Sequence, residues 1–306
     1  MNQLRDGKKS MAKESFIHLF EWSPRVHADP FHTHDHLEIG YCLSGSGMFY
    51  FGDKTYAVEP GDVFVVNHLE RHAAVSRADN PSRYLFLYFS AGLLEQTDPE
   101  LLVPFVYLPT KFQNRIPGER TAAQQIGELF HLIAEEHQRQ PRGYLGMMKG
   151  YILQICALLL RYYTAEAPSA DWNHTLMSYY RIKPVLEFIQ ERFREPISLD
   201  DIASQLALSP SRVRHLFQEK LGIGFKQYVL QMRVNEAKKL LAGSDLPISE
   251  IMYASGFQSH GPFYRAFGQI VGMAPMDYRE RAAKLALFEN ISLENKTTRQ
   301  NLPGKM

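Results

Sequence analysis

The stretch Ile248–Arg279, ISEIMYASGFQSHGPFYRAFGQIVGMAPMDYR, decides the fold because an earlier part of the chain repeats its pattern. Both copies contain a short amphipathic helix, a tight turn, a second helix, a glycine and a tyrosine. An internal repeat is a strong fold signal, and two short helices joined by a tight turn predict a helix-turn-helix unit. Corresponding residues lie 49 or 50 positions apart: Ile202 and Ile251, Leu208 and Phe257, Phe217 and Phe267, Gly222 and Gly272, Tyr228 and Tyr278.

The first copy carries clear helix-start signals. Ser198 followed by Asp201 predicts a capping box, in which each side chain satisfies a backbone amide. Ser209 and Pro210 predict the start of the next helix, since proline at the first helical position loses no hydrogen bond. A longer helix is expected over 225–242, between the two copies.

The second helix of a helix-turn-helix unit enters the major groove of DNA. Its expected outward residues are Ser211, Arg212, Arg214 and His215 in the first copy, and His260, Gly261, Tyr264 and Arg265 in the second. Arg214 and Arg265 are the strongest candidates for reading guanine, because a guanidinium can donate to both acceptors that guanine presents in the major groove. The alternative for each is a phosphate contact, which strengthens binding to all sequences alike. For Arg212 we favour that alternative.

The stretch Ile248–Arg279 and the earlier copy of its pattern resemble the signature of the AraC/XylS family of bacterial transcription activators. The resemblance implies an all-α tandem helix-turn-helix domain over 178–285 that binds double-stranded DNA and works with RNA polymerase. Departures at His215, Gly261, Pro262 and Gly268 bear on the target sequence rather than the fold. The matching residues are Ile248, Glu250, Ile251, Gly256, Phe257, Ser259, Phe263, Arg265, Phe267, Gly272, Pro275, Tyr278 and Arg279, and, in the first copy, Leu208, Ser209, Pro210, Ser211, Leu216, Phe217, Gly222, Arg233 and Ala237.

Composition sets the cellular context. The 306 residues carry a net charge of +1, but within 178–285 there are 15 Lys and Arg against 11 Asp and Glu, a modest basic excess that favours nucleic acid. Cys42 and Cys156 have neither metal nor redox spacing, which indicates a reduced cytoplasmic protein. No apolar run approaches the ~20 residues of a spanning helix, and no signal peptide is recognisable. Met1 and Met11 are alternative starts.

The region before residue 90 has a different pattern, of short strands separated by turns. Strands are expected at 37–43, 48–51, 55–58, 63–67 and 83–90, with turns at 44–47, 52–53 and 60–62. Many short strands at regular spacing predict an all-β barrel or a double-sheet jelly roll.

This region also resembles the cupin fold. His32, His34, Glu38 and Gly45 fit the spacing of the first cupin motif, and Pro60-Gly61-Asp62 followed by His72 fits the second in part. Together with the AraC/XylS resemblance, this implies an effector-sensing domain over 1–115 for a sugar or oligosaccharide.

Three interpretations of the histidines remain open. In the first, His32, His34, Glu38 and His72 hold a divalent metal, since imidazole suits several such ions. In the second, which we favour, there is no cofactor and His34, Glu38 and His72 hydrogen-bond the hydroxyl groups of the ligand. The third is a surface cluster without function. We expect His36 to face solvent.

An enzyme is the main alternative function, because metal-dependent cupin enzymes also use histidine-rich barrels; a metal-sensing regulator is another. We expect no enzyme, since a catalyst does not need a tandem DNA-reading domain. The sequence also shows no serine–histidine–aspartate set, phosphate loop or paired-carboxylate motif.

Two helices are expected after the barrel, at 119–136 and 146–163. Each has an apolar stripe that either covers the barrel or, as the AraC/XylS resemblance favours, pairs two subunits into a homodimer. We therefore predict an α+β protein of two domains: a cupin-like barrel over 1–115 with a helical dimerisation segment over 116–165, a linker over 166–177, the DNA-binding domain over 178–285 and a tail over 286–306.

Overall fold

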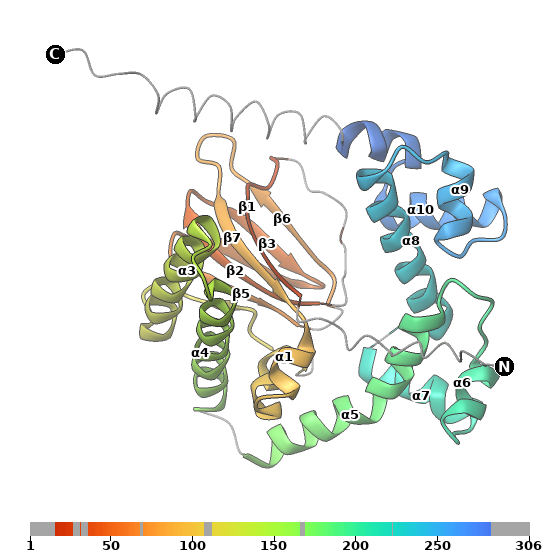
Figure 1. Ribbon diagram of the computed structural model, residues 1–306, viewed down its shortest axis with the longest axis horizontal. Helices are drawn as coiled ribbons and strands as arrows, with labels where there is room; N and C mark the ends of the chain where they lie inside the picture. The colour runs from red at the N-terminus through yellow and green to blue at the C-terminus, as the bar shows by residue number, and fades with distance from the viewer. Residues whose placement is uncertain are drawn as a thin grey trace, which may run out of the picture. The chain divides into compact units, whose positions relative to one another are not determined.

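The computed structural model of the chain describes residues 16–26, 31, 36–67, 70–106, 112–165, 169–221 and 223–282. These residues belong to two compact units, whose main boundary falls between Tyr180 and Arg181 (Figure 1). The first unit contains both β-sheets, and the second is helical. The predicted α+β fold class with two domains is confirmed. No described helix combines the length and apolar character needed to cross a membrane.

The strands of the first unit form two antiparallel sheets, as expected for a double-sheet barrel. One sheet has the order β1-β7-β2-β5-β8 and the other β4-β3-β6. All five predicted strands are present, whereas β1, β6 and β8 were not predicted individually. The strands are β1 (Ile17–Trp22), β2 (Leu37–Ser44), β3 (Gly47–Phe51), β4 (Lys54–Val58), β5 (Val63–Val66), β6 (His72–Ser76), β7 (Arg83–Phe89) and β8 (Arg115–Ile116).

Side-chain alternation along β2 divides the first unit into two cores. Leu37 and Ile39 belong to the core that the sheet shares with the helices, whereas Cys42 belongs to a second core formed with the opposite sheet. Aromatic rings dominate this second core, which includes Phe49, Phe51, Phe64, Tyr84 and Phe86.

The helices of the first unit are α1 (Ala91–Glu95), the short 3-10 helix η1 (Pro99–Leu102), α2 (Val103–Val106), α3 (Thr121–Arg139) and α4 (Tyr144–Thr164). Both predicted apolar stripes are buried within the unit: Ile126, Phe130 and Ile133 of α3 and Met148, Ile152, Ile155 and Leu159 of α4 join the core of the five-stranded sheet. Other faces of these helices expose Leu132, Leu145 and Met147.

Helix α5 (Ser169–Arg192) begins inside the segment 166–177, whose composition predicts a linker. Residues 169–177 are instead helical. The reason is tertiary burial, because Trp172 and Leu176 pack against the core of the first unit. Such packing overrides the weak local preference of a polar segment.

The second unit contains two helix-turn-helix pairs. The first pair is α6 (Leu199–Gln205) and α7 (Pro210–Leu221), the second is α9 (Ile248–Ala254) and α10 (His260–Val271), and α8 (Phe225–Gly243) connects them (Figure 1). The predicted capping box of Ser198 and Asp201 is present, and Ser209 Oγ accepts from the Arg212 amide at 3.2 Å.

Candidate effector and DNA-binding sites

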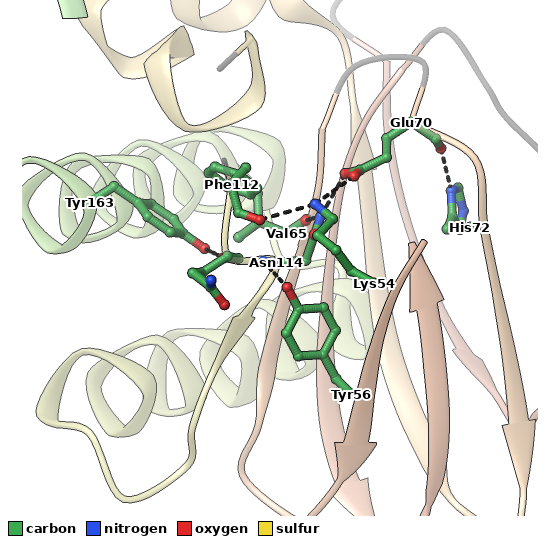
Figure 2. A network of polar contacts seen from close by, with 9 residues as sticks. Lys54, Tyr56, Val65, Glu70, His72, Phe112, Asn114 and Tyr163 are labelled. Carbon is green, nitrogen blue, oxygen red and sulfur yellow. Dashed lines mark hydrogen bonds and ion pairs between the residues drawn. The ribbon is translucent and has the colours of Figure 1, made fainter. Parts of the chain in front are cut away.

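A histidine–carboxylate pair is buried inside the first unit. Glu38 on β2 and His72 at the start of β6 are each 2% exposed. His72 Nε2 lies 3.5 Å from Glu38 Oε2, and His72 Nδ1 lies 2.9 Å from the carbonyl oxygen of Glu70 (Figure 2). Both ring nitrogens therefore face acceptors, and only the doubly protonated imidazolium can donate to both.

Charges around the pair agree with that protonation state. Burial lowers the pKa of His72, but the Glu38 carboxylate and the Glu70 carbonyl outweigh burial and raise this pKa overall. Burial and then the Glu38 carboxylate raise the pKa of Tyr88, whose hydroxyl bonds Glu38. Tyr88 thus stays protonated and donates, so Glu38 accepts from two side chains.

Aromatic rings surround the Tyr88 end of this group. The His36 ring is 4.1 Å from the Tyr88 ring, and Phe20 packs edge-on against Tyr88 at 4.8 Å. His36 is half-buried, so the expectation that it faces solvent is wrong. Residues 36 and 38 are two positions apart and share a face of the extended chain. The sequence had not indicated Tyr88, although its place in the alternating strand 83–90 was visible.

His32 and His34 lie outside the described residues, so the structure brings together only Glu38 and His72 of the four predicted metal ligands. Among the residues that are described, no three His, Cys, Asp or Glu side chains are arranged to hold a metal ion. The ligand set His32, His34, Glu38 and His72 remains a prediction, as does the ligand contact of His34.

Asp62, from the partial second cupin motif, has a structural role. Its fully buried carboxylate accepts from the Glu59 amide at 2.8 Å and the Gly118 amide at 3.0 Å. Arg115 donates to the same carboxylate from Nε at 2.8 Å and Nη2 at 3.1 Å. Asp62 therefore fixes the turn at Gly61 to β8 and to the approach to α3.

The predicted DNA-reading residues all lie on exposed surface of the second unit. Ser211, Arg212, Arg214 and His215 are exposed on α7, and His260, Gly261, Tyr264 and Arg265 on α10. The neighbouring apolar residues Val213, Leu216 and Phe217 of α7, and Phe263, Ala266 and Phe267 of α10, are buried. Each helix thus presents a polar face outward, as reading a major groove requires.

The two reading faces differ in chemistry. On α7, His215 Nε2 lies 3.2 Å from Glu219 Oε2 one helical turn away, and two arginines are exposed. On α10, the His260 and Tyr264 rings stack at 6.3 Å. A side chain at Gly261 would come within 3.5 Å of Arg265 Nη1, so the guanidinium lies back over the first turn of α10.

Arg233 of α8 connects the second pair to the residues that directly follow α5. Arg233 Nε donates to the Phe193 carbonyl at 2.7 Å, and Arg233 Nη2 donates to the Glu195 carbonyl at 2.8 Å. Its guanidinium also lies 6.0 Å from the centre of the Phe257 ring, just after the second turn. The sequence matches a family arginine here, but it did not indicate these partners.

Comparison with known proteins agrees with this architecture. Residues 17–144 match the AraC-like ligand binding domain family, and residues 202–281 match a helix-turn-helix domain family. The HTH-type transcriptional activator RhaR of Yersinia pestis bv. Antiqua is 25% identical over 251 residues, covering 82% of this chain and 84% of the relative. RhaR of Pectobacterium atrosepticum is 24% identical over 257 residues, covering 82% and 86%.

A solved structure of ToxT from Vibrio cholerae shares the fold, with a TM-score of 0.62 at 15% identity, covering 86% of this chain and 96% of that one. With an AraC-like ligand-binding domain followed by an AraC-type helix-turn-helix domain, the chain belongs to the AraC/XylS family of transcription regulators.

Proposed function

We propose that the protein is a cytoplasmic transcription activator whose first unit binds a small sugar or oligosaccharide between its sheets. The effector changes how the ligand-binding domain acts on its own DNA-binding domain or on a second subunit. Such a response requires that the effector bind the two states with different affinity. The relatives named RhaR are activators, which supports activation over repression.

The observation that carries the effector site is the group formed by buried Glu38 and His72 together with half-buried Tyr88. A carboxylate, an imidazole and a phenol offer the acceptors and donors that sugar hydroxyls need. The rings of His36 and Phe20, which pack against the Tyr88 ring, supply apolar faces. Ligand sites typically combine such apolar walls with a few converging polar groups.

For the DNA, we propose that Arg214 and Arg265 read guanine and that Arg212 binds phosphate. Ser211, His215, His260, Gly261 and Tyr264 complete the contact surface. The exposure of all eight residues supports this assignment. Two reading helices in one chain fit two major-groove segments about 34 Å apart on one side of the DNA.

We also propose a homodimer through α3 and α4. Because the two apolar stripes of these helices are buried within the unit, the interface uses their outward faces. Leu132, Leu145 and Met147, which are 42%, 50% and 48% exposed, are the apolar residues available there. Contact with RNA polymerase follows the activator role and is part of the same proposal.

Thermal unfolding of the full chain with a panel of neutral pentoses, hexoses and oligosaccharides tests the effector site. A ligand at 100 times its Kd stabilises the folded state by about 2.7 kcal/mol. We expect one sugar class to raise the Tm of the wild type and of Glu59→Gln, and to have no effect on Glu38→Gln. Glu59 is the matched control because its side chain is 72% exposed.

Two further readings complete this experiment. Metal analysis of the purified protein separates the alternatives, since a stoichiometric metal would replace the sugar proposal with a metal-dependent site.

Thermal unfolding between pH 5 and 8 tests the pair of Glu38 and His72 itself. Because the pKa of His72 is raised, its stabilisation is complete below the ordinary value of 6.5 and is lost as the pH rises through the folded pKa. A Tm of the first unit that is equally pH-dependent in His72→Gln would contradict this.

A further inference from the structure

Residues 112–114 lie between the sheets and the last turns of α4 (Figure 2). On the α4 side, the Tyr163 hydroxyl donates to the Gln113 carbonyl at 2.7 Å, and its ring lies 4.5 Å from that of Phe112. Burial raises the pKa of Tyr163 well above its ordinary value, so the hydroxyl keeps the proton that it donates. This bond fastens the C-terminal end of α4 to the segment.

On the sheet side, polar contacts centred on the Glu70 carboxylate hold the same segment. Lys54 Nζ lies 2.7 Å from Glu70 Oε1 and donates to the Phe112 carbonyl at 3.0 Å. Asn114 Nδ2 donates to Glu70 Oε2 at 2.6 Å. Glu70 is 7% exposed and Asn114 is fully buried. Water therefore screens these contacts little.

The backbone of Glu70 connects these contacts to the effector site. Its carbonyl oxygen lies 2.9 Å from His72 Nδ1, and the other nitrogen of His72 faces Glu38 at 3.5 Å. A series of polar contacts thus runs from Glu38 through His72, Glu70 and the segment 112–114 to Tyr163. Covalent bonds join the contacts within Glu70, from its carbonyl to its carboxylate, and along the backbone of 112–114.

We propose that this series couples the effector site to the C-terminal end of α4, with Glu70, Asn114 and Tyr163 as positioning residues that do not touch the effector. The proposal rests on the proposed effector site. An effector hydroxyl that bonds Glu38 competes with His72 for the carboxylate, and the other bond of His72 ends on Glu70. In the effector-free state the Glu38 carboxylate pairs with His72, and in the effector-bound state it pairs with the effector.

The end of α4 is a useful place for the signal to arrive. In the chain, α4 is followed by α5, which begins in the first unit and ends beyond its boundary with the second. A change in the last turn of α4 therefore reaches the start of the DNA-binding unit through the covalent chain. Allosteric responses commonly use such small shifts of a packed helix.

Amide hydrogen exchange on the full chain, followed by mass spectrometry of peptides, tests the coupling without a known effector. Glu38→Gln keeps the shape of the side chain but removes the charge that holds His72. We expect exchange to become about three to ten times faster in residues 112–116 and 158–165. Exchange in α3 should stay unchanged. His72→Gln provides an independent disturbance of the same pair.

Tyr163→Phe removes only the hydroxyl that binds Gln113. In this background, Glu38→Gln should still speed exchange in 112–116, but its effect on 158–165 should disappear. Tyr162→Phe is the matched control, because it makes the same change one residue earlier on α4 and should leave the effect intact. A Glu38→Gln response that spares 158–165, or that survives Tyr163→Phe unchanged, overturns the coupling.

The sugar melts keep this result separate from the effector proposal. If a sugar stabilises the wild type but Glu38→Gln leaves exchange in residues 158–165 unchanged, the coupling alone is overturned. An α4 response to Glu38→Gln in a protein that no sugar stabilises overturns the sugar proposal and leaves the coupling standing.

Discussion

The two helix-turn-helix pairs have the same plan but are stabilised differently. The first relies on local bonds: Ser198 and Asp201 form a full capping box on α6, and Ser209 caps α7. The second lacks both, since neither Pro247 before α9 nor Ser259 before α10 makes a side-chain capping bond. Its stability must come from packing against the rest of the unit.

The turns show the same contrast. Ala207 and Gly256 hold equivalent places in the two turns, with φ of 52° and 92°. The first turn accommodates an alanine at positive φ, and Ala207 is exposed there, whereas the second turn requires glycine. A Cβ at Gly256 would lie 2.7 Å from Arg194 Cα and 3.0 Å from the Arg194 carbonyl oxygen. The second turn thus packs closely against the segment that follows α5, where Arg194 also pairs with Glu236 of α8.

The largest expected effect is that of Gly256→Ala. The new methyl group meets backbone atoms that cannot move aside, and the positive φ adds strain, so we expect a loss of about 2–5 kcal/mol of stability. Chemical denaturation of the full chain measures it. Gly268→Ala is the control, because a Cβ there has no neighbour within 4 Å. Equal stability of the two variants would break the comparison.

Arg233→Met should have the next largest effect. It keeps much of the side-chain volume but removes both bonds to the carbonyls of Phe193 and Glu195, at a cost of about 2–3 kcal/mol. The same denaturation curves report it. Arg212→Met on the exposed face of α7 should change stability by less than about 0.5 kcal/mol. If Arg233→Met left the free energy of unfolding unchanged, α8 would not hold the second pair to the residues that follow α5.

The reading faces can be compared through base specificity. On a selected DNA site, Arg214→Ala and Arg265→Ala should each lose about 1–3 kcal/mol of discrimination, at one base position apiece. Arg212→Ala should weaken binding to all sequences and reduce the salt slope by about one. Fluorescence anisotropy on single-base variants of the site at several salt concentrations separates these outcomes. Uniform losses for Arg265→Ala would make it a phosphate contact.

The smallest expected effect has the opposite sign. Ala207→Gly relieves the positive φ of the first turn and should stabilise the protein by up to about 1 kcal/mol. Differential scanning calorimetry of the variant against the wild type measures the shift in Tm. A loss of stability would show that the alanine methyl group packs usefully in the first turn.

Sequence reasoning predicted features whose signal is periodic or local. The repeat located both helix-turn-helix pairs, alternation located five strands, and Ser198 with Asp201 located a cap. It did not predict contacts between distant elements. Tyr88 meets Glu38 only because β7 pairs with β2, and Arg233 meets Phe193 and Glu195 only after α5 and α8 pack together. The helix over 169–177 was missed for the same reason, since its stability depends on burial of Trp172 and Leu176.

Selection of DNA from a random library by the full wild-type chain tests the central claim most directly. Two helix-turn-helix pairs on one chain predict that the half-site bound by each chain has two conserved segments, centred about 10–10.5 base pairs apart. Arg214→Ala should erase preference within one segment and Arg265→Ala within the other. A single conserved segment, affected by only one of the two substitutions, would contradict the account.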